Sequence, residues 1–394
     1  MTACTHRERS GHAELARALT AGGVLTPDWA SAFAAVPRAA FLPEVMWPFD
    51  MAAGTSVAVS REGDPVGWQA YADADVPVVT QWDDGAHSGR EPGRVSTSSA
   101  SMPSVVFRML ADLDVRPGDR VLEIGTGTGW NAALLAHRAG TGNVVSVEVD
   151  GAVAARARSA LERFGAGVRV VHGDGCEGHR EGAPYDRVIV TAGVRRVPFT
   201  WVRQTRPGGL VVLPWGTDYG NGDGIARLTV ARDGRSAAGF FTGPVEFMKL
   251  RAQRLAPVVH GEYVTGGPED RDASTTELTE DALLGERFAP QRFAVGLRVP
   301  RCHHVVAERR DDMGTARPVW FYGLDDRSWA CVLFRDGDEA RVWQAGPRRL
   351  WDEVEAAYRW WEGEGRPGHE RFGLTVTAEG QAAWLDAPDR SWPV

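Results

Sequence analysis

Lysine is almost missing from this chain. Lys249 is the only lysine among 394 residues, so arginine supplies nearly all the positive charge, and the formal net charge is −8 at pH 7. A protein that binds nucleic acid through bulk electrostatics needs an excess of positive charge. The composition therefore argues against that class, although a local basic groove stays compatible with it.

Long apolar runs are missing too. No stretch approaches the roughly 18 apolar residues of a membrane-spanning helix, and the segment from Met1 to Leu19 has scattered charges without an apolar centre. We therefore expect a cytoplasmic protein without a membrane partner.

Cysteine is scarce and unpaired in sequence. The four cysteines form no Cys-x-x-Cys pair, so neither a zinc site nor a disulfide framework is indicated. Cys302-His303-His304 is the only cluster of soft metal ligands in the sequence. Adjacent residues on a strand point to opposite faces and rarely bind one ion. We predict plain strand residues there and no metal site.

The most informative segment runs from Val121 to Trp130 and reads Val-Leu-Glu-Ile-Gly-Thr-Gly-Thr-Gly-Trp, with Glu148 at the end of the next apolar run. Alternating glycines after a short strand let the backbone turn sharply beside a nucleotide-like ligand, and the later acid can accept hydrogen bonds from ribose hydroxyls. A dinucleotide fingerprint would need glycine at position 130. The pattern indicates a nucleoside cofactor without pyrophosphate; the alternative is a glycine-rich turn that binds no ligand.

Strands and helices alternate after Pro103, which begins a helix. Short apolar runs predict strands at 120–124, 144–149, 168–172, 187–191 and 210–214, and helical spacing predicts helices at 131–138 and 152–164. This order predicts an α/β, Rossmann-like domain with helices on both faces of a parallel sheet.

The two ends of the chain differ from this core. Residues 14–25 have helical spacing, whereas 51–94 are rich in Gly, Asp and Pro and predict loops and irregular strands. Beyond Arg251, strand-like runs at 293–299, 319–322, 329–334 and 341–344 and one helix at 350–361 predict an α+β accessory domain. We thus expect domains at 1–251, divided into a substrate-covering part (1–102) and a core (103–251), and at 252–394.

A series of short motifs resembles the protein-L-isoaspartate O-methyltransferases in content and order, and together they cover about residues 14–251. They are Ala35-Val36-Pro37-Arg38 with Phe41-Leu42-Pro43, Ala70-Tyr71-Ala72-Asp73, Leu122 to Gly129, His172-Gly173-Asp174-Gly175, Ala183 to Ala192 and Pro207-Gly208-Gly209-Leu210-Val211.

The resemblance implies S-adenosylmethionine as the cofactor and no metal. The glycine loop would hold its methionine and ribose portions, Glu148 the ribose hydroxyls and Asp174 the adenine amine, although Asp174 also fits a simple turn. The implied cofactor residues are Glu123, Gly125, Thr126, Gly127, Thr128, Gly129, Glu148, Val149, Gly173, Asp174 and Gly175.

The resemblance places the substrate just before Pro103. The family has a Thr-Ile-Ser-Gln-Pro-like motif there, where this chain reads Ser99-Ala100-Ser101-Met102-Pro103. Ser101 matches the serine that contacts the substrate carboxyl, and Ser98 and Ser99 are further candidates, because a hydroxyl can donate to a carboxylate near a helix start. The alternative is a polar linker with a helix cap, and Met102 in place of glutamine puts the usual substrate in doubt.

A carboxylate acceptor fits the lack of other catalytic groups. It is ionised at neutral pH, with a pKa of about 4, and the sulfonium is an activated donor, so alignment and exclusion of water suffice without a strong base. Methyltransferases of exocyclic base amines usually carry an Asn/Asp-Pro-Pro-Tyr/Phe motif after the fourth strand. Thr191-Ala192-Gly193-Val194 stands there instead, which again argues against a nucleic-acid partner.

The region after Arg251 is rich in tryptophan, including Trp320, Trp329, Trp343, Trp351, Trp360 and Trp361. Such residues suit a peptide-recognition surface, while core packing is the alternative for each. The long architecture resembles the family branch found with ribosomally made peptides such as graspetides, lanthipeptides and lasso peptides. It implies methylation of an aspartate in a precursor peptide, followed by closure to aspartimide.

Three functional hypotheses follow. The first is this aspartimide-forming peptide methyltransferase, and the second is an isoaspartyl repair enzyme with an appended domain; in both, the partner is a peptide or protein that carries Asp or isoAsp. The third is a cofactor-binding scaffold without catalysis, which the intact glycines, Glu148 and Asp174 disfavour.

Overall fold

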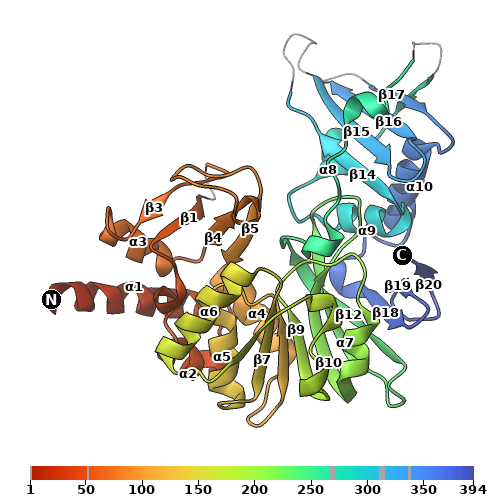
Figure 1. Ribbon diagram of the computed structural model, residues 1–394. Helices are drawn as coiled ribbons and strands as arrows, with labels where there is room; N and C mark the ends of the chain where they lie inside the picture. Colours follow the sequence, from red (N-terminus) through yellow and green to blue (C-terminus); the bar gives the residue numbers. More distant parts are fainter. Residues whose placement is uncertain (1, 51–52, 267–270, 310–315, 336–338) are drawn as a thin grey trace. The chain divides into compact units, whose positions relative to one another are not determined.

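Figure 1 shows the computed structural model of the chain, which describes residues 2–50, 53–266, 271–309, 316–335 and 339–394. It forms two compact units. Unit 1 comprises Met1–Ala192, Pro198–Leu213 and Arg227–Ala238; unit 2 comprises Gly193–Val197, Pro214–Ala226 and Gly239–Val394.

The centre of unit 1 is a parallel sheet in the order β10-β9-β6-β7-β8. Its strands are short and apolar, and all four residues of β6 are buried, as expected when helices cover a parallel sheet. The predicted α/β Rossmann-like class is confirmed. The elements are α4 (Pro103–Leu113), β6 (Val121–Ile124), α5 (Trp130–Ala139), β7 (Val144–Glu148), α6 (Gly151–Phe164), β8 (Arg169–His172), β9 (Tyr185–Val190), α7 (Phe199–Gln204) and β10 (Thr205–Trp215).

A smaller antiparallel sheet precedes this core, in the order β2-β1-β4-β5 with β3 on β1. The prediction of loops and irregular strands for 51–94 was incomplete, because a helix and regular pairing occur there; residues 51–52 lie outside the described residues. Met46, Trp68, Val78 and Ala100 bury one another, and this long-range packing is invisible to local periodicity. The elements are α1 (Thr2–Ala21), α2 (Pro27–Ala35), β1 (Val45–Asp50), β2 (Thr55–Ser56), β3 (Val59–Ser60), α3 (Pro65–Ala72), β4 (Val78–Trp82) and β5 (Ser96–Ala100).

Unit 2 contains an antiparallel sheet in the order β13-β17-β16-β15-β14. The three C-terminal strands, β18 to β20, follow β12 in the strand order β20-β19-β18-β12 of the ten-stranded sheet. The predicted boundary at residue 251 therefore falls inside unit 2. The elements are β11 (Asp223–Val230), β12 (Ser236–Val245), β13 (Asp272–Thr276), α8 (Glu280–Leu284), α9 (Pro290–Arg298), β14 (Cys302–Val306), β15 (Ala316–Gly323), β16 (Trp329–Arg335), β17 (Ala340–Ala345), α10 (Leu350–Gly363), β18 (Phe372–Thr377), β19 (Gln381–Leu385) and β20 (Ser391–Pro393).

The strand predicted at 293–299 is wrong, since this segment belongs to helix α9. Phe293, Val295 and Leu297 alternate as in a strand, but Pro290 stands in the first helical turn, which favours a helix. The ring of Phe293 lies 4.9 Å from that of Phe241, so tertiary packing holds its face. A short apolar run cannot distinguish the periodicity of a helix from that of a strand.

The tryptophans after Arg251 divide between core and surface. Trp329, Trp351 and Trp361 are buried, whereas Trp320, Trp343 and Trp360 are partly exposed. Cys302, His303 and His304 lie on β14 as predicted, and the described residues contain no group of metal-ligating side chains. Among the same residues, no helix is both long and apolar enough to cross a bilayer.

Candidate active site

The glycine loop connects β6 to α5 through backbone that other residues rarely adopt. Gly125, Gly127 and Gly129 have φ values of 98°, 54° and 90°. A Cβ on Gly125 would lie 2.8 Å from the Thr191 hydroxyl oxygen, and one on Gly127 would lie 3.2 Å from the Ser99 carbonyl oxygen. The glycines thus let strand β5 and the end of β9 approach the loop closely.

Glu148 ends β7 and faces this loop. Its Oε2 accepts a hydrogen bond from the backbone N–H of Gly127 at 3.0 Å, and its Oε1 accepts one from Asp150 at 3.1 Å. A carboxylate has about four acceptor positions, so lone pairs remain for two ribose hydroxyls. The contact of Glu148 with ribose stays a prediction, and its placement leaves acceptor positions for it.

Glu123 supports the loop from below instead of facing a ligand. It is fully buried, and it accepts hydrogen bonds from Ser146 and, at 2.7 Å, from Asn131. Ser146 in turn shares a hydrogen bond with Thr126. Burial raises the pKa of Glu123 to about 7 despite these two donors. Among the predicted cofactor residues, Glu123 and Thr126 thus have side chains that are buried within the protein.

The remaining predicted cofactor residues follow β7 and β8. Val149 is exposed beside Glu148, and Asp174 is exposed after β8. Asp174 also caps a short turn, because its Oδ1 accepts from the Cys176 N–H at 2.9 Å. Gly175 has no room for a side chain, since a Cβ there would lie 2.6 Å from Ile124. Asp174 therefore keeps both predicted roles open, as turn residue and as adenine contact.

A cavity of about 350 Å³ lies beside the glycine loop. Of the three candidate serines, only Ser98 lines it, together with Thr80 and the loop residues Gly127 and Thr128. The Thr80 hydroxyl donates to the Ser98 Oγ at 3.3 Å, which leaves the Ser98 O–H to donate into the cavity. Arg156 and Arg163 of α6 also line the cavity, so the site favours an anion.

The other two serines contribute backbone. The Ser99 carbonyl lies against Gly127, and the Ser101 carbonyl accepts from Arg38 at 3.0 Å. Ser98 and Ser99 are neighbours on a strand, so their side chains point to opposite faces. The linker alternative for this segment is replaced by strand β5.

Arg38 is the main residue whose function sequence reasoning missed. Its guanidinium is buried and donates to the carbonyls of Val76, Ala100 and Ser101 at 3.0, 2.8 and 3.0 Å. It thereby fixes the end of β5 beside the cavity. Burial lowers the pKa of Arg38 to about 9. The only sequence signal was its place in the Val-Pro-Arg motif.

A glutamine joins the two halves of the site. Gln81 Nε2 donates to Asp150 Oδ2 at 3.1 Å, and Gln81 Oε1 accepts from Thr97 of β5 at 2.9 Å. Asp150 also caps α6 by accepting from Ala152 and Val153. Strand β5 is therefore tied to the chain just after Glu148.

Comparison with known proteins identifies the family. Residues 66–237 match the model of the protein-L-isoaspartate(D-aspartate) O-methyltransferases. Protein-L-isoaspartate O-methyltransferase 1 of Rhodopseudomonas palustris is 35% identical over 216 residues, which are 55% of this chain and 72% of that protein. The protein-L-isoaspartate O-methyltransferase of Ignicoccus hospitalis is 34% identical over 204 residues, or 51% of this chain and 80% of that protein.

The chain belongs to the protein-L-isoaspartate O-methyltransferase family. Members of this family are S-adenosylmethionine-dependent carboxyl O-methyltransferases that act on protein substrates. The glycine cradle and Glu148 fit that cofactor, since they leave space and hydrogen-bond acceptors for a nucleoside.

A solved structure shares the fold over nearly the whole chain. It is titled protein-L-isoaspartate O-methyltransferase, and the match covers 95% of this chain and 100% of that one with a TM-score of 0.53 and 23% identity. The fold of the long chain is therefore found outside this protein as well.

Proposed function

We propose that this chain transfers the methyl group of S-adenosylmethionine to an aspartate-derived carboxylate in a peptide or protein, with isoaspartate as the acceptor. One observation carries the proposal: Gly127 belongs to the cofactor loop and lines the same cavity as Ser98 and the two arginines. The candidate acceptor-binding groups and the cofactor loop thus line one cavity, which supports the proposal that a carboxylate binds beside the methyl donor.

The residues of the cavity suit the acceptor in charge and hydrogen bonding. Arg156 and Arg163 attract a carboxylate, and the Ser98 O–H can donate to one of its oxygens. The cofactor supplies a methyl group activated by its sulfonium. The second carboxylate oxygen forms the new O–CH₃ bond as the S–CH₃ bond breaks, so the ester and the thioether are both neutral and no proton has to be removed. Alignment of the two reactants is the protein's task.

A second candidate acceptor is the aspartate of a ribosomally made, modified peptide. Met102 supports it, because the glutamine that the family motif leads us to expect is replaced by a side chain that does not form strong hydrogen bonds. In that reaction the following backbone N–H would attack the ester, its proton would leave with methoxide as methanol, and an aspartimide would remain. The length of the chain does not favour this candidate by itself, since the solved protein-L-isoaspartate O-methyltransferase structure shares the fold over 95% of the chain.

We further propose that residues 252–394 help to bind the peptide. Partly exposed Trp320, Trp343 and Trp360 support this role because aromatic side chains are common in recognition surfaces. Nucleic acid is not a partner in this proposal.

Mass spectrometry can distinguish the two candidate acceptors, isoaspartate and the aspartate of a modified peptide. The full-length protein and S-adenosylmethionine are incubated with an isoaspartyl peptide, its aspartyl isomer, and the peptide encoded beside the gene in linear and pre-cyclised forms. We expect methylation of the isoaspartyl peptide and little of its isomer. Turnover restricted to the pre-cyclised peptide, with later loss of methanol, would contradict isoaspartate and establish the second candidate.

A further inference from the structure

Unit 2 contains a second cavity, of about 280 Å³, that the proposed methyl transfer does not use. Four arginines line it: Arg195, Arg196, Arg254 and Arg301. Among its lining residues in the described ranges, Asp218 contributes the only carboxylate side chain. The cavity is therefore rich in positive charge, in a chain whose net charge is −8.

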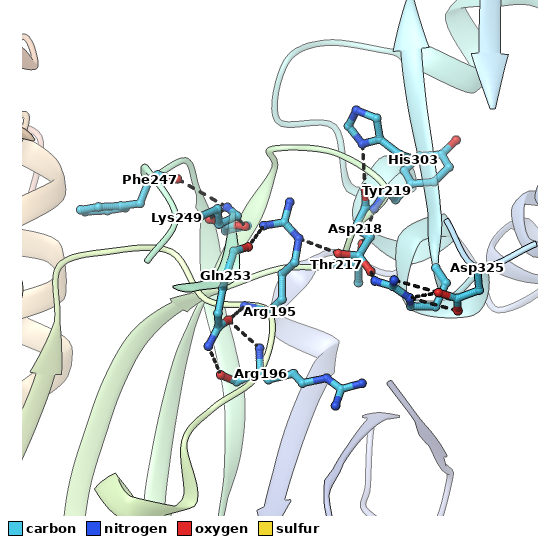
Figure 2. Close-up of polar contacts among 12 residues, drawn as sticks. Arg195, Arg196, Thr217, Asp218, Tyr219, Phe247, Lys249, Gln253, His303 and Asp325 are labelled. Atoms are coloured by element: carbon cyan, nitrogen blue, oxygen red, sulfur yellow. Dashed lines mark hydrogen bonds and ion pairs between the residues drawn. The ribbon is translucent and has the colours of Figure 1, made fainter. Parts of the chain in front are cut away.

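Two glutamines hold the backbone that carries Arg195 and Arg196. Gln253 Oε1 accepts from the N–H groups of both arginines at 2.7 and 3.0 Å, and its Nε2 donates to the Arg196 carbonyl at 2.8 Å (Figure 2). From the C-terminal part, Gln381 accepts from the Val197 N–H at 3.1 Å and donates to the Arg195 carbonyl at 2.6 Å. The segment is thus fixed by side-chain amides, and its arginine side chains are presented from a defined backbone.

Asp218 balances only part of the charge. Its two oxygens lie 2.7 Å from Arg195 Nε and 2.7 Å from Arg301 Nη1 (Figure 2). Arg301 also donates hydrogen bonds to both carboxylate oxygens of Asp325. Its hydrogen bonds to Asp325, and to a smaller extent the one to Asp218, raise the pKa of Arg301. Ion pairs with Asp218 thus hold the guanidinium groups of Arg195 and Arg301 at the wall of the cavity.

Arg196 differs from these two. Its side chain is exposed, and within the described ranges its guanidinium has no hydrogen-bond or ion-pair partner. Figure 2 shows the Arg196 side chain extending away from the Gln253 amide that holds its backbone. A free guanidinium matches the two oxygens of a carboxylate. Apolar Trp215 and Leu297 line the same cavity and suit the aliphatic part of a glutamate or aspartate.

We propose that this cavity binds an acidic side chain of the substrate, at a position other than the residue that is methylated. The proposal rests on the proposed function for the statement that the ligand is a peptide. The sequence supports a link to catalysis, because Arg195 follows Thr191 by four residues and Thr191 donates to the Gly125 carbonyl of the cofactor loop at 2.6 Å. The chain selects acidic peptides through Arg196.

The test compares two isoaspartyl peptides that differ only in flanking glutamates or glutamines. For the wild-type chain we expect the KM of the glutamate peptide to be about fivefold lower, because an ion pair at an exposed arginine contributes up to about 1 kcal/mol. Arg196→Gln should remove this difference and leave kcat unchanged, and Arg196→Glu should invert it. Arg341→Gln is the matched control, because Arg341 is exposed in unit 2 and does not line the cavity.

Calorimetry with an unmethylatable peptide separates the two proposals. That peptide carries asparagine instead of isoaspartate, so its binding does not depend on turnover. Binding that Arg196→Gln weakens and Arg341→Gln does not would support the cavity even if the isoaspartyl peptide were not methylated, which would refute only the proposed function. A glutamate preference that persists in Arg196→Gln, no preference in the wild type, or binding of inorganic phosphate but not of the peptide would each overturn the inference.

Discussion

At the scale of single residues, Glu148 connects the cofactor loop to the sheet. Its carboxylate accepts hydrogen bonds from the backbone N–H groups of Gly127 and Asp150, so it ties the loop to the end of β7. The same group has lone pairs left for ribose. One side chain therefore holds the loop and keeps acceptor positions for the predicted ribose contact.

Glu148→Gln should weaken cofactor binding. The amide keeps the size of the side chain but loses one acceptor oxygen and the charge, and hydrogen bonds to charged groups are worth about 1.5–3 kcal/mol. We expect the Kd of S-adenosylhomocysteine to rise roughly tenfold to a hundredfold, measured by calorimetry. Glu162→Gln, on the exposed face of α6, serves as the control. An unchanged Kd in Glu148→Gln would remove this residue from the cofactor site.

Glu123 makes stability depend on pH. Its folded pKa of about 7 lies above its ordinary value of 4.5, so the folded protein holds an additional proton between these two pH values. The contribution of Glu123 to the free energy of unfolding is complete below pH 4.5 and is lost as the pH rises to 7. At about 1.4 kcal/mol per pKa unit, the loss is at most about 3 kcal/mol.

Glu123→Gln should remove this dependence, because an amide does not titrate. Ser146 and Thr126 can reverse their shared hydrogen bond to accept from the new N–H₂ group. Urea unfolding at pH 5 and pH 8 measures the effect as the difference between variant and wild type. We expect the variant to gain up to about 3 kcal/mol over the wild type on going to pH 8. Parallel pH profiles would show that Glu123 is ionised throughout.

Sequence reasoning could predict a role only for residues whose spacing forms a local pattern. The glycines and Glu148 were predicted because a strand, a tight turn and a later acid form a local pattern. The burial of Glu123 and the choice of Ser98 over Ser99 and Ser101 depend on which face of an unforeseen strand meets the cavity. No local pattern records that.

At the scale of elements, long-range packing explains why strand β5 was not foreseen and why a strand was wrongly predicted at 293–299. Strand β5 is polar and pairs with β4, so its partner and not its own composition makes it a strand. Helix α9 has a strand-like alternation and is held by contacts such as that of Phe293 with Phe241. The parallel sheet was predicted well because its buried strands have continuous apolar runs.

Arg38→Met should loosen β5 from its support. Methionine fills a similar volume but donates no hydrogen bond, so carbonyls at Val76, Ala100 and Ser101 lose their partner. Leaving buried acceptors unsatisfied costs about 1–3 kcal/mol each, and we expect a loss of about 2–4 kcal/mol in the free energy of unfolding, measured with urea. The control is Arg232→Met at an exposed position of the same unit. Equal stability of the two variants would contradict the role of Arg38.

At the scale of the whole molecule, the family model and most of unit 2 cover different parts of the chain. The family model matches residues 66–237, whereas most of unit 2 lies beyond them. The cavity proposed as the methyl-transfer site is lined by residues of unit 1 alone. Catalysis and selection of the peptide can therefore be tested with separate substitutions in the full-length chain.

The central claim is that a carboxylate meets the methyl donor in the cavity lined by Ser98. The direct measurement is the initial rate of isoaspartyl peptide methylation by the wild type, Ser98→Ala and Ser101→Ala, with the Kd of S-adenosylhomocysteine measured for each. Loss of a hydrogen bond to a charged group predicts that Ser98→Ala lowers kcat/KM about tenfold or more at an unchanged Kd, while Ser101→Ala stays near the wild type. An inactive wild type, or a Ser98→Ala variant as active as the wild type, would contradict the account.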